Sequence, residues 1–222
     1  PTMHRMRADF ESLLSDVRNK KVLEIGCGRG DFALGLLGEG AGFVAGIDIS
    51  DVYVADAEAK ALAAGYGPAT HQFKVMDAHH LEFDDNQFDF VVGHGILHHL
   101  ELDVCLAEIR RALRPGGCAL FVEPLAGNPL LAVFRVMTPK ARTPDERPLD
   151  VHDLDRIGRD WDVHSRYYGV LAAPVAAFTS IFLRPFPNNP LLGAADWIER
   201  KLQRVGFLKP MNQYVLLVLR KP

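Results

Sequence analysis

Glycines and a carboxylate meet near the start of the chain. Val22–Gly30 reads VLEIGCGRG, in which Glu24 stands two residues before the first of three alternating glycines, Gly26, Gly28 and Gly30. Glycines after a first strand let the backbone turn tightly and approach a ligand closely. A carboxylate beside such a loop repels a diphosphate and attracts an ammonium or sulfonium group. The pattern therefore favours a positively charged nucleoside, while a simple strand-to-helix turn stays open as the alternative.

Two more acids follow the next two predicted strands. Asp48 ends the segment GFVAGID and is followed by Ile49, and Asp77 ends the segment KVMD. An acid at the tip of the second strand typically accepts hydrogen bonds from ribose hydroxyls. One at the third strand can accept from the exocyclic amine of a base, and either acid could instead cap a helix or turn. Because parallel strands end at one edge of a sheet, we expect Glu24, Asp48 and Asp77 to share one ligand.

Strand-like and helix-like segments alternate between these acids. Short apolar runs predict strands at 21–26, 42–48, 72–76, 88–93 and 118–123. Leu102–Leu113 carries apolar residues at helical spacing and is expected to end at the Pro-Gly-Gly that follows. Nearly continuous apolar strands separated by helices indicate a parallel sheet that is covered on both faces. The expected fold class is a doubly wound α/β sheet.

The composition indicates the class of protein and the compartment in which it works. The chain has 222 residues, 48% of them hydrophobic and 24% charged, which is typical of a globular protein. Its three cysteines form no close pair, which favours a reducing compartment, so we expect a cytoplasmic protein without a metal site. The net charge is −3, with an acidic first half and a basic second half. Binding to nucleic acid is not expected.

With these features together, the chain resembles class I S-adenosylmethionine-dependent methyltransferases, of the small-molecule, type 11-like kind. The resemblance rests on five segments in order: EIGCGRG (24–30), GIDIS (46–50), MDAHHLEF (76–83), FDFVVGHGILHHL (88–100) and LRPGG (113–117). It implies a Rossmann-like sheet of seven strands, mostly parallel, whose last strand is antiparallel and lies beside the fifth. Tyr214–Leu219 (YVLLVL) is the predicted last strand.

The resemblance also implies a binding site for S-adenosylmethionine, which leaves as S-adenosylhomocysteine. The residues that would hold it are Glu24, Gly26, Cys27, Gly28 and Gly30 for the methionine part, Asp48 for the ribose, Ile49, Asp77 and Ala78 for the adenine, and His94 for the methionyl end or the acceptor. Transfer to a hydroxyl acceptor needs a base with a pKa near neutrality, which points to histidine. We therefore predict His94 and His98 as catalytic residues, with a backbone role for His94 and a helix-start role for His98 as the alternatives.

The second half of the chain follows no pattern of the family. We divide the chain into a donor-binding part (1–124), an acceptor-side elaboration and cap within the same domain (125–213), and the final strand (214–222). Residues 167–183 carry no charge. They predict a cap over an apolar pocket, or, with the basic residue at 184, a peripheral membrane contact; a dimer interface or core helix is the third alternative.

The expected function is methyl transfer from S-adenosylmethionine to a small, hydrophobic or lipid-like acceptor. An NAD-type oxidoreductase and a non-catalytic nucleoside-binding scaffold remain as alternatives. The G-x-G-x-G spacing and Glu24 argue against the first of these, and only turnover excludes the second. The sequence leaves the acceptor and the oligomeric state open.

Overall fold

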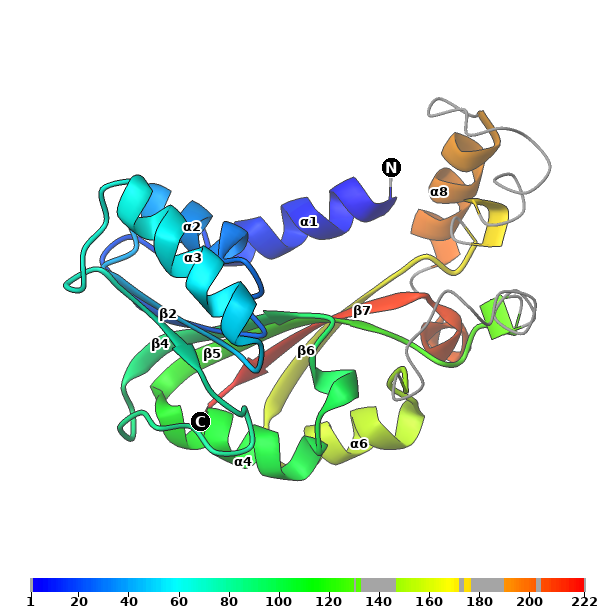
Figure 1. Cartoon of the computed structure of the whole chain (residues 1–222). Helices are drawn as coiled ribbons and strands as arrows, with labels where there is room; N and C mark the ends of the chain where they lie inside the picture. The colour runs from blue at the N-terminus through cyan, green and yellow to red at the C-terminus, as the bar shows by residue number, and fades with distance from the viewer. Residues whose placement is uncertain are drawn as a thin grey trace.

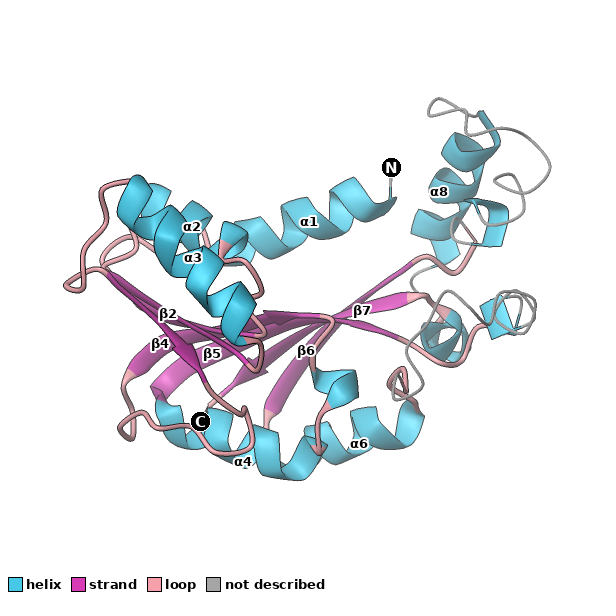
Figure 2. Ribbon diagram, viewed as in Figure 1, coloured by secondary structure: helices cyan, strands magenta, loops and turns pink. Residues whose placement is uncertain are grey.

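A computed structural model describes residues 2–129, 131–132, 147–171, 174–176, 190–202 and 205–221. The elements, in chain order, are α1 (Thr2–Leu13), β1 (Lys21–Ile25), α2 (Asp31–Gly38), β2 (Phe43–Asp48), α3 (Asp51–Ala63), β3 (His71–Val75), β4 (Phe88–His94), η1 (Leu97–His99), α4 (Leu102–Ala112), β5 (Leu113–Pro124), α6 (Val151–Asp160), β6 (Asp162–Tyr168), α8 (Pro190–Leu202), η3 (Gly206–Met211) and β7 (Tyr214–Arg220). One sheet runs through the molecule, with helices on both of its faces (Figures 1 and 2).

The sheet has seven strands in the order β3-β2-β1-β4-β5-β7-β6. The strands from β3 to β5 pair in parallel, whereas β7 is antiparallel to both β5 and β6. The predicted fold is confirmed, including the antiparallel last strand beside the fifth. In this order β1 lies inside the sheet, and Glu24 sits level with Gly46 of β2 and Val92 of β4. The glycine loop therefore starts near the middle of the carboxyl edge.

Alternating side chains build a core on each face of the sheet. Leu23 and Ile25 of β1 pack in the cluster that contains residues of α4 and α6. Val22 packs on the other face, in the cluster that contains residues of α1 and α2. Figure 1 shows the same division, with α1, α2 and α3 above the sheet and α4 and α6 below it. Because side chains alternate along a strand, Glu24 points to the face of α1 and α2.

The predicted strands and helices agree with the observed ones except at three places. The helix α1 was not predicted, although Met6, Phe10 and Leu14 stand at helical spacing and are buried. The strand β5 begins at Leu113 because this residue already pairs with Phe88, before a register shift. The amphipathic pattern of 188–206 predicts one helix; the structure shows α8 over Pro190–Leu202 and η3 from Gly206, while 188–189 and 203–204 lie outside the described residues.

The uncharged segment 167–183 is described only in part. Its first residues belong to β6 and the turn after it, while 172–173 and 177–183 lie outside the described residues. The cap, the membrane contact and the dimer interface predicted there therefore stay predictions. No helix among the described residues is long and apolar enough to span a bilayer.

Two glycines provide a test of the packing between β2 and β3. A Cβ atom at Gly46 would lie 2.6 Å from ring carbons of Phe73, so we expect Gly46→Ala to lower the free energy of unfolding by about 1–3 kcal/mol. The matched variant is Gly35→Ala in α2, where a Cβ atom meets nothing within 4 Å. It should raise the free energy of unfolding by about 0.5–1 kcal/mol. Urea denaturation of both variants measures these changes, and equal stabilities would contradict the packing described.

Candidate functional site

The glycine loop turns the chain sharply between β1 and α2. Gly26, Gly28 and Gly30 all have positive φ, at 69°, 51° and 75°. Two features of Gly30 exclude any larger residue. Its positive φ disfavours a side chain, and a Cβ atom there would lie 2.7 Å from the Cβ of Ala57. The loop is fastened to β2, since the Cys27 N–H donates to the Ile47 carbonyl at 2.9 Å. Its backbone is thus held against the carboxyl edge of the sheet.

Glu24 is a buried acid with spare bonding capacity. Only 4% of the residue is exposed, and its buried Oε2 atom has no hydrogen-bond partner among the described residues. Burial raises the pKa of Glu24 to about 8, while the N–H of Ala33 favours the charged form and Asp31 and Asp48 disfavour it. An unpartnered carboxylate oxygen at the wall of a pocket is suited to a cationic group of a ligand.

Asp48 links the loop to the start of α3. Its Oδ2 accepts a hydrogen bond from the Gly28 N–H at 2.9 Å, and its Oδ1 accepts from the Ser50 N–H at 3.0 Å. The N-cap of α3 is Ser50, whose side chain accepts from the Tyr53 N–H. The capping role considered for Asp48 therefore falls to Ser50. Next to Asp48, Ile49 is 82% exposed, an unusual position for an aliphatic side chain.

Asp77 and Ala78 follow β3 at the same edge. The Met76 N–H donates to the Asp48 carbonyl at 3.1 Å, which keeps the ends of β2 and β3 together. Asp77 accepts hydrogen bonds from the backbone and the ring of His79. These hydrogen bonds hold the pKa of Asp77 below its usual value, and the bond from the backbone N–H contributes most. Ala78 is buried, with 5% of its surface exposed.

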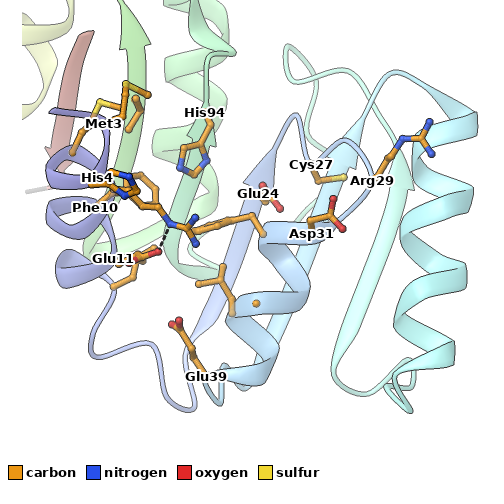
Figure 3. Close-up of a pocket in the computed structure, with 17 residues that line it drawn as sticks. Met3, His4, Phe10, Glu11, Glu24, Cys27, Arg29, Asp31, Glu39 and His94 are labelled. Carbon is orange, nitrogen blue, oxygen red and sulfur yellow. Dashed lines mark hydrogen bonds and ion pairs between the residues drawn. The ribbon is translucent and has the colours of Figure 1, made fainter. Parts of the chain in front are cut away.

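A pocket of about 710 Å³ opens beside Glu24, between α1, α2 and the end of β4. Figure 3 shows Glu24 and His94 on neighbouring strands, with Phe10 of α1 beside His94 and Cys27 on the loop. Seven of its seventeen lining residues are large and apolar: Met3, Met6, Phe10, Leu14, Phe32, Leu36 and Val122. Charged residues stand among them, including Arg7, Glu11 and Asp31. We call this space the α1 pocket.

His94 lies in the α1 pocket and packs against two aromatic rings, which also contact each other. Its ring centroid is 4.4 Å from that of Phe10 and 4.9 Å from that of Phe32. Partial burial lowers the pKa of His94; the charge of Glu123 opposes this shift and that of Arg7 adds to it. The imidazole is therefore neutral at neutral pH and able to accept a proton. Burial also raises the pKa of the Cys27 thiol to about 12, so Cys27 is no nucleophile.

His98 occupies a different position from His94. Its Nδ1 lies 2.7 Å from Oε2 of Glu123, and only 5% of its side chain is exposed. It borders a second pocket of about 210 Å³ near Arg147 and Asp153, not the α1 pocket. Glu123 was not predicted as a residue of the site, although it ends the predicted strand 118–123 as the other acids end theirs. Its fully buried carboxylate also accepts from the N–H groups of Ile96 and Leu97.

The structure thus gathers the predicted residues along one edge of the sheet. Glu24, Cys27 and His94 line the α1 pocket, while Asp48 and Asp77 stand at the tips of the next strands. Among the described residues, no group of three His, Cys, Asp or Glu side chains is placed to hold a metal ion. Phe10 and the rest of α1 are the part of the site that was not foreseen.

Known proteins resemble this chain in sequence and in fold. Residues 22–117 match the family model of a methyltransferase domain. A demethylmenaquinone methyltransferase of Staphylococcus aureus is 33% identical over 124 residues, which are 54% of this chain and 48% of the relative. The chain spans about half the length of the curated relatives that it matches.

Solved structures agree on the fold. Phosphoethanolamine N-methyltransferase 2 of Haemonchus contortus, in complex with phosphomonomethylethanolamine and S-adenosylhomocysteine, superposes with a TM-score of 0.66 at 21% identity, over 97% of this chain and 52% of that one. An S-adenosylmethionine-dependent methyltransferase of Mesorhizobium loti gives 0.65 at 18% identity, over 96% of both chains. The predicted resemblance is confirmed: residues 22–117 match a methyltransferase domain, and the chain has the fold of class I S-adenosylmethionine-dependent methyltransferases.

Proposed function

We propose that this protein transfers a methyl group from S-adenosylmethionine to a small, hydrophobic or lipid-like acceptor. The observation that carries the proposal is the buried carboxylate of Glu24, which has an unpartnered oxygen beside a glycine loop and a largely apolar pocket. A positively charged ligand would compensate the buried charge, and a diphosphate would worsen it. This argues against the NAD-type alternative.

Residues of the site can be assigned to each part of S-adenosylmethionine. Glu24 would hold its ammonium group, with backbone groups of the loop from Gly26 to Gly30, including Cys27, around the methionine part. Asp48 would accept from the ribose hydroxyls with the lone pairs that Gly28 and Ser50 leave unused. The exposed Ile49 would cover one face of the adenine, and Asp77 with Ala78 would meet its edge. When bound, S-adenosylmethionine supplies a methyl group on a positively charged sulfur.

The α1 pocket is where we place the acceptor. Phe10, Phe32 and His94 present three rings toward one space, as a flat aromatic acceptor would need. The curated relative is named for demethylmenaquinone, a lipid-like quinone, which supports an acceptor of this class. The predicted contact of 167–184 with a membrane would bring such an acceptor to the enzyme. The free cysteines remain consistent with the expected cytoplasmic location.

His94 is the base that we assign to the transfer. As the acceptor atom bonds the methyl group it loses a proton, and the neutral imidazole of His94 can take it up. Phe10 and Phe32 pack against the ring of His94, which stays exposed toward the pocket. His98 does not line the α1 pocket, and its pairing with the buried Glu123 favours a supporting role in the turn after β4.

Donor binding tests the acids directly. We expect Glu24→Gln and Asp48→Asn each to weaken the binding of S-adenosylhomocysteine by about tenfold or more, because a hydrogen bond to a charged group contributes about 1.5–3 kcal/mol. The matched control is Asp51→Asn, an exposed acid in the first turn of α3. Isothermal titration calorimetry of the four proteins measures the affinities. Unchanged affinity in both test variants would reject the donor site.

Proton linkage tests the state of Glu24. The pKa of about 8 leaves Glu24 mostly protonated at pH 7 in the free protein, and a bound ammonium favours the ionised form. Affinity for S-adenosylhomocysteine should therefore rise from about pH 6 to about pH 8, with release of a proton on binding. Calorimetry in buffers of different ionisation enthalpy counts that proton. The release should vanish in Glu24→Gln; a pH-independent affinity in the unsubstituted protein would contradict the assignment.

Turnover tests the base and the class of acceptor. With a reduced short-chain demethylmenaquinone as acceptor, His94→Gln should lower kcat by about 100-fold or more and leave the affinity for S-adenosylhomocysteine unchanged. In the unsubstituted enzyme kcat should rise with pH through the pKa of His94, which lies below 6.5, and then stay level. His99→Gln, at an exposed position outside the α1 pocket, is the control. Efficient methylation of phosphomonomethylethanolamine instead would refute a hydrophobic acceptor, and no turnover of either would favour a scaffold.

A further inference from the structure

The turn after β3 holds the side chain of Asp77 in one orientation. Oδ1 of Asp77 accepts a hydrogen bond from the backbone N–H of His79 at 2.9 Å. Nδ1 of the His79 ring lies 2.6 Å from the same oxygen. Two contacts on one carboxylate oxygen fix the rotation of the whole group.

The far side of the His79 ring determines where its proton is. The backbone N–H of Glu101, which precedes α4, donates to Nε2 of His79 at 2.8 Å. A backbone N–H can only donate, so Nε2 must be unprotonated. The proton of a neutral ring therefore sits on Nδ1, where it is donated to Asp77. His79 thus connects the end of β3 with the start of α4 as a neutral group.

The other oxygen of Asp77 is left for a ligand. Within the part of the chain that the structure describes, Oδ2 receives no hydrogen bond, and 62% of the side chain is exposed. Asp77 keeps its negative charge, because the hydrogen bonds from the backbone and the ring of His79 lower its pKa. The group stands beside the tip of β2, where Met76 is bonded to Asp48.

We propose that His79 is a positioning residue that sets the base selectivity of the donor site, by holding Asp77 with Oδ2 toward the exocyclic amine of adenine. The proposal rests on the proposed function, because it takes the nucleoside to lie along the acids at the strand tips. An amine at this position donates to the carboxylate, whereas a carbonyl oxygen there is repelled by it. A fixed carboxylate discriminates between the two better than a rotating one, since it need not be ordered on binding.

A purely structural role for His79, as a brace for the start of α4, makes a different prediction. Asn at position 79 can donate from the place of Nδ1 and cannot reach Glu101. Gln at position 79 places its side-chain oxygen near the position of Nε2, where it can accept a hydrogen bond from the N–H of Glu101. It loses the side-chain contact with Asp77. The variants His79→Asn and His79→Gln therefore separate the two contacts that the imidazole makes. The backbone bond from residue 79 to Asp77 persists in both, so a partial effect is expected.

The experiment compares two ligands that differ only at the base. S-adenosylhomocysteine carries an exocyclic amine, and S-inosylhomocysteine carries a carbonyl oxygen in its place. Calorimetry on the full chain gives the ratio of their affinities for the unsubstituted protein and for His79→Asn, His79→Gln and His79→Ala. We expect the preference for the adenine ligand to fall by about 3- to 10-fold in the Gln and Ala variants and to persist in the Asn variant.

Each other outcome overturns the inference in a recognisable way. If His79→Gln keeps the preference while His79→Asn loses it, or if all variants weaken both ligands equally, His79 only braces α4. If the preference is unchanged in every variant, Asp77 needs no support from the ring. If the unsubstituted protein binds neither ligand, the proposed function itself fails, which distinguishes that failure from the failure of this inference.

Discussion

Burying a carboxylate removes its hydration, and a protein must either neutralise the group or give it a partner. In the free protein Glu24 is neutralised, because burial raises its pKa to about 8. Its side chain is buried at the edge of the sheet, and one oxygen has no partner among the described residues. The glycine loop, the face toward α1 and α2, and the α1 pocket are all placed around this group. A cationic ligand would replace the missing partner, so the same residue that costs stability in the free state favours binding.

The other acids at the strand ends organise the backbone before any ligand arrives. Asp48 accepts hydrogen bonds from the N–H groups of Gly28 and Ser50. The buried Glu123 accepts hydrogen bonds from N–H groups of the turn after β4. In the same way Asp77 is held by the backbone and ring of His79. Each carboxylate therefore fixes one loop of the edge. A site whose loops are already ordered loses less entropy when it binds.

The helix α1 joins the donor side of the molecule to the second half of the chain. Arg5 of α1 pairs with the buried Glu199 of α8 at 3.0 Å, and Asp9 accepts from the hydroxyl of Tyr168 in β6 at 2.6 Å. Figure 1 shows the N-terminal end of α1 next to α8. Through these contacts α8 and β6 support the helix whose Phe10 lines the α1 pocket.

Local patterns of the sequence were enough to predict the parallel sheet and the acids at three strand tips, because apolar runs and glycine turns encode strands and their ends. The antiparallel last strand was implied by the resemblance to class I methyltransferases. Three features were decided only by the tertiary structure. The face covered by α1, and with it the contact of Phe10 with His94, depends on packing between segments far apart in the chain. The pairing of His98 with Glu123 and the unpartnered oxygen of Glu24 depend on burial, which no spacing in the sequence reports, since burial results from all neighbours together.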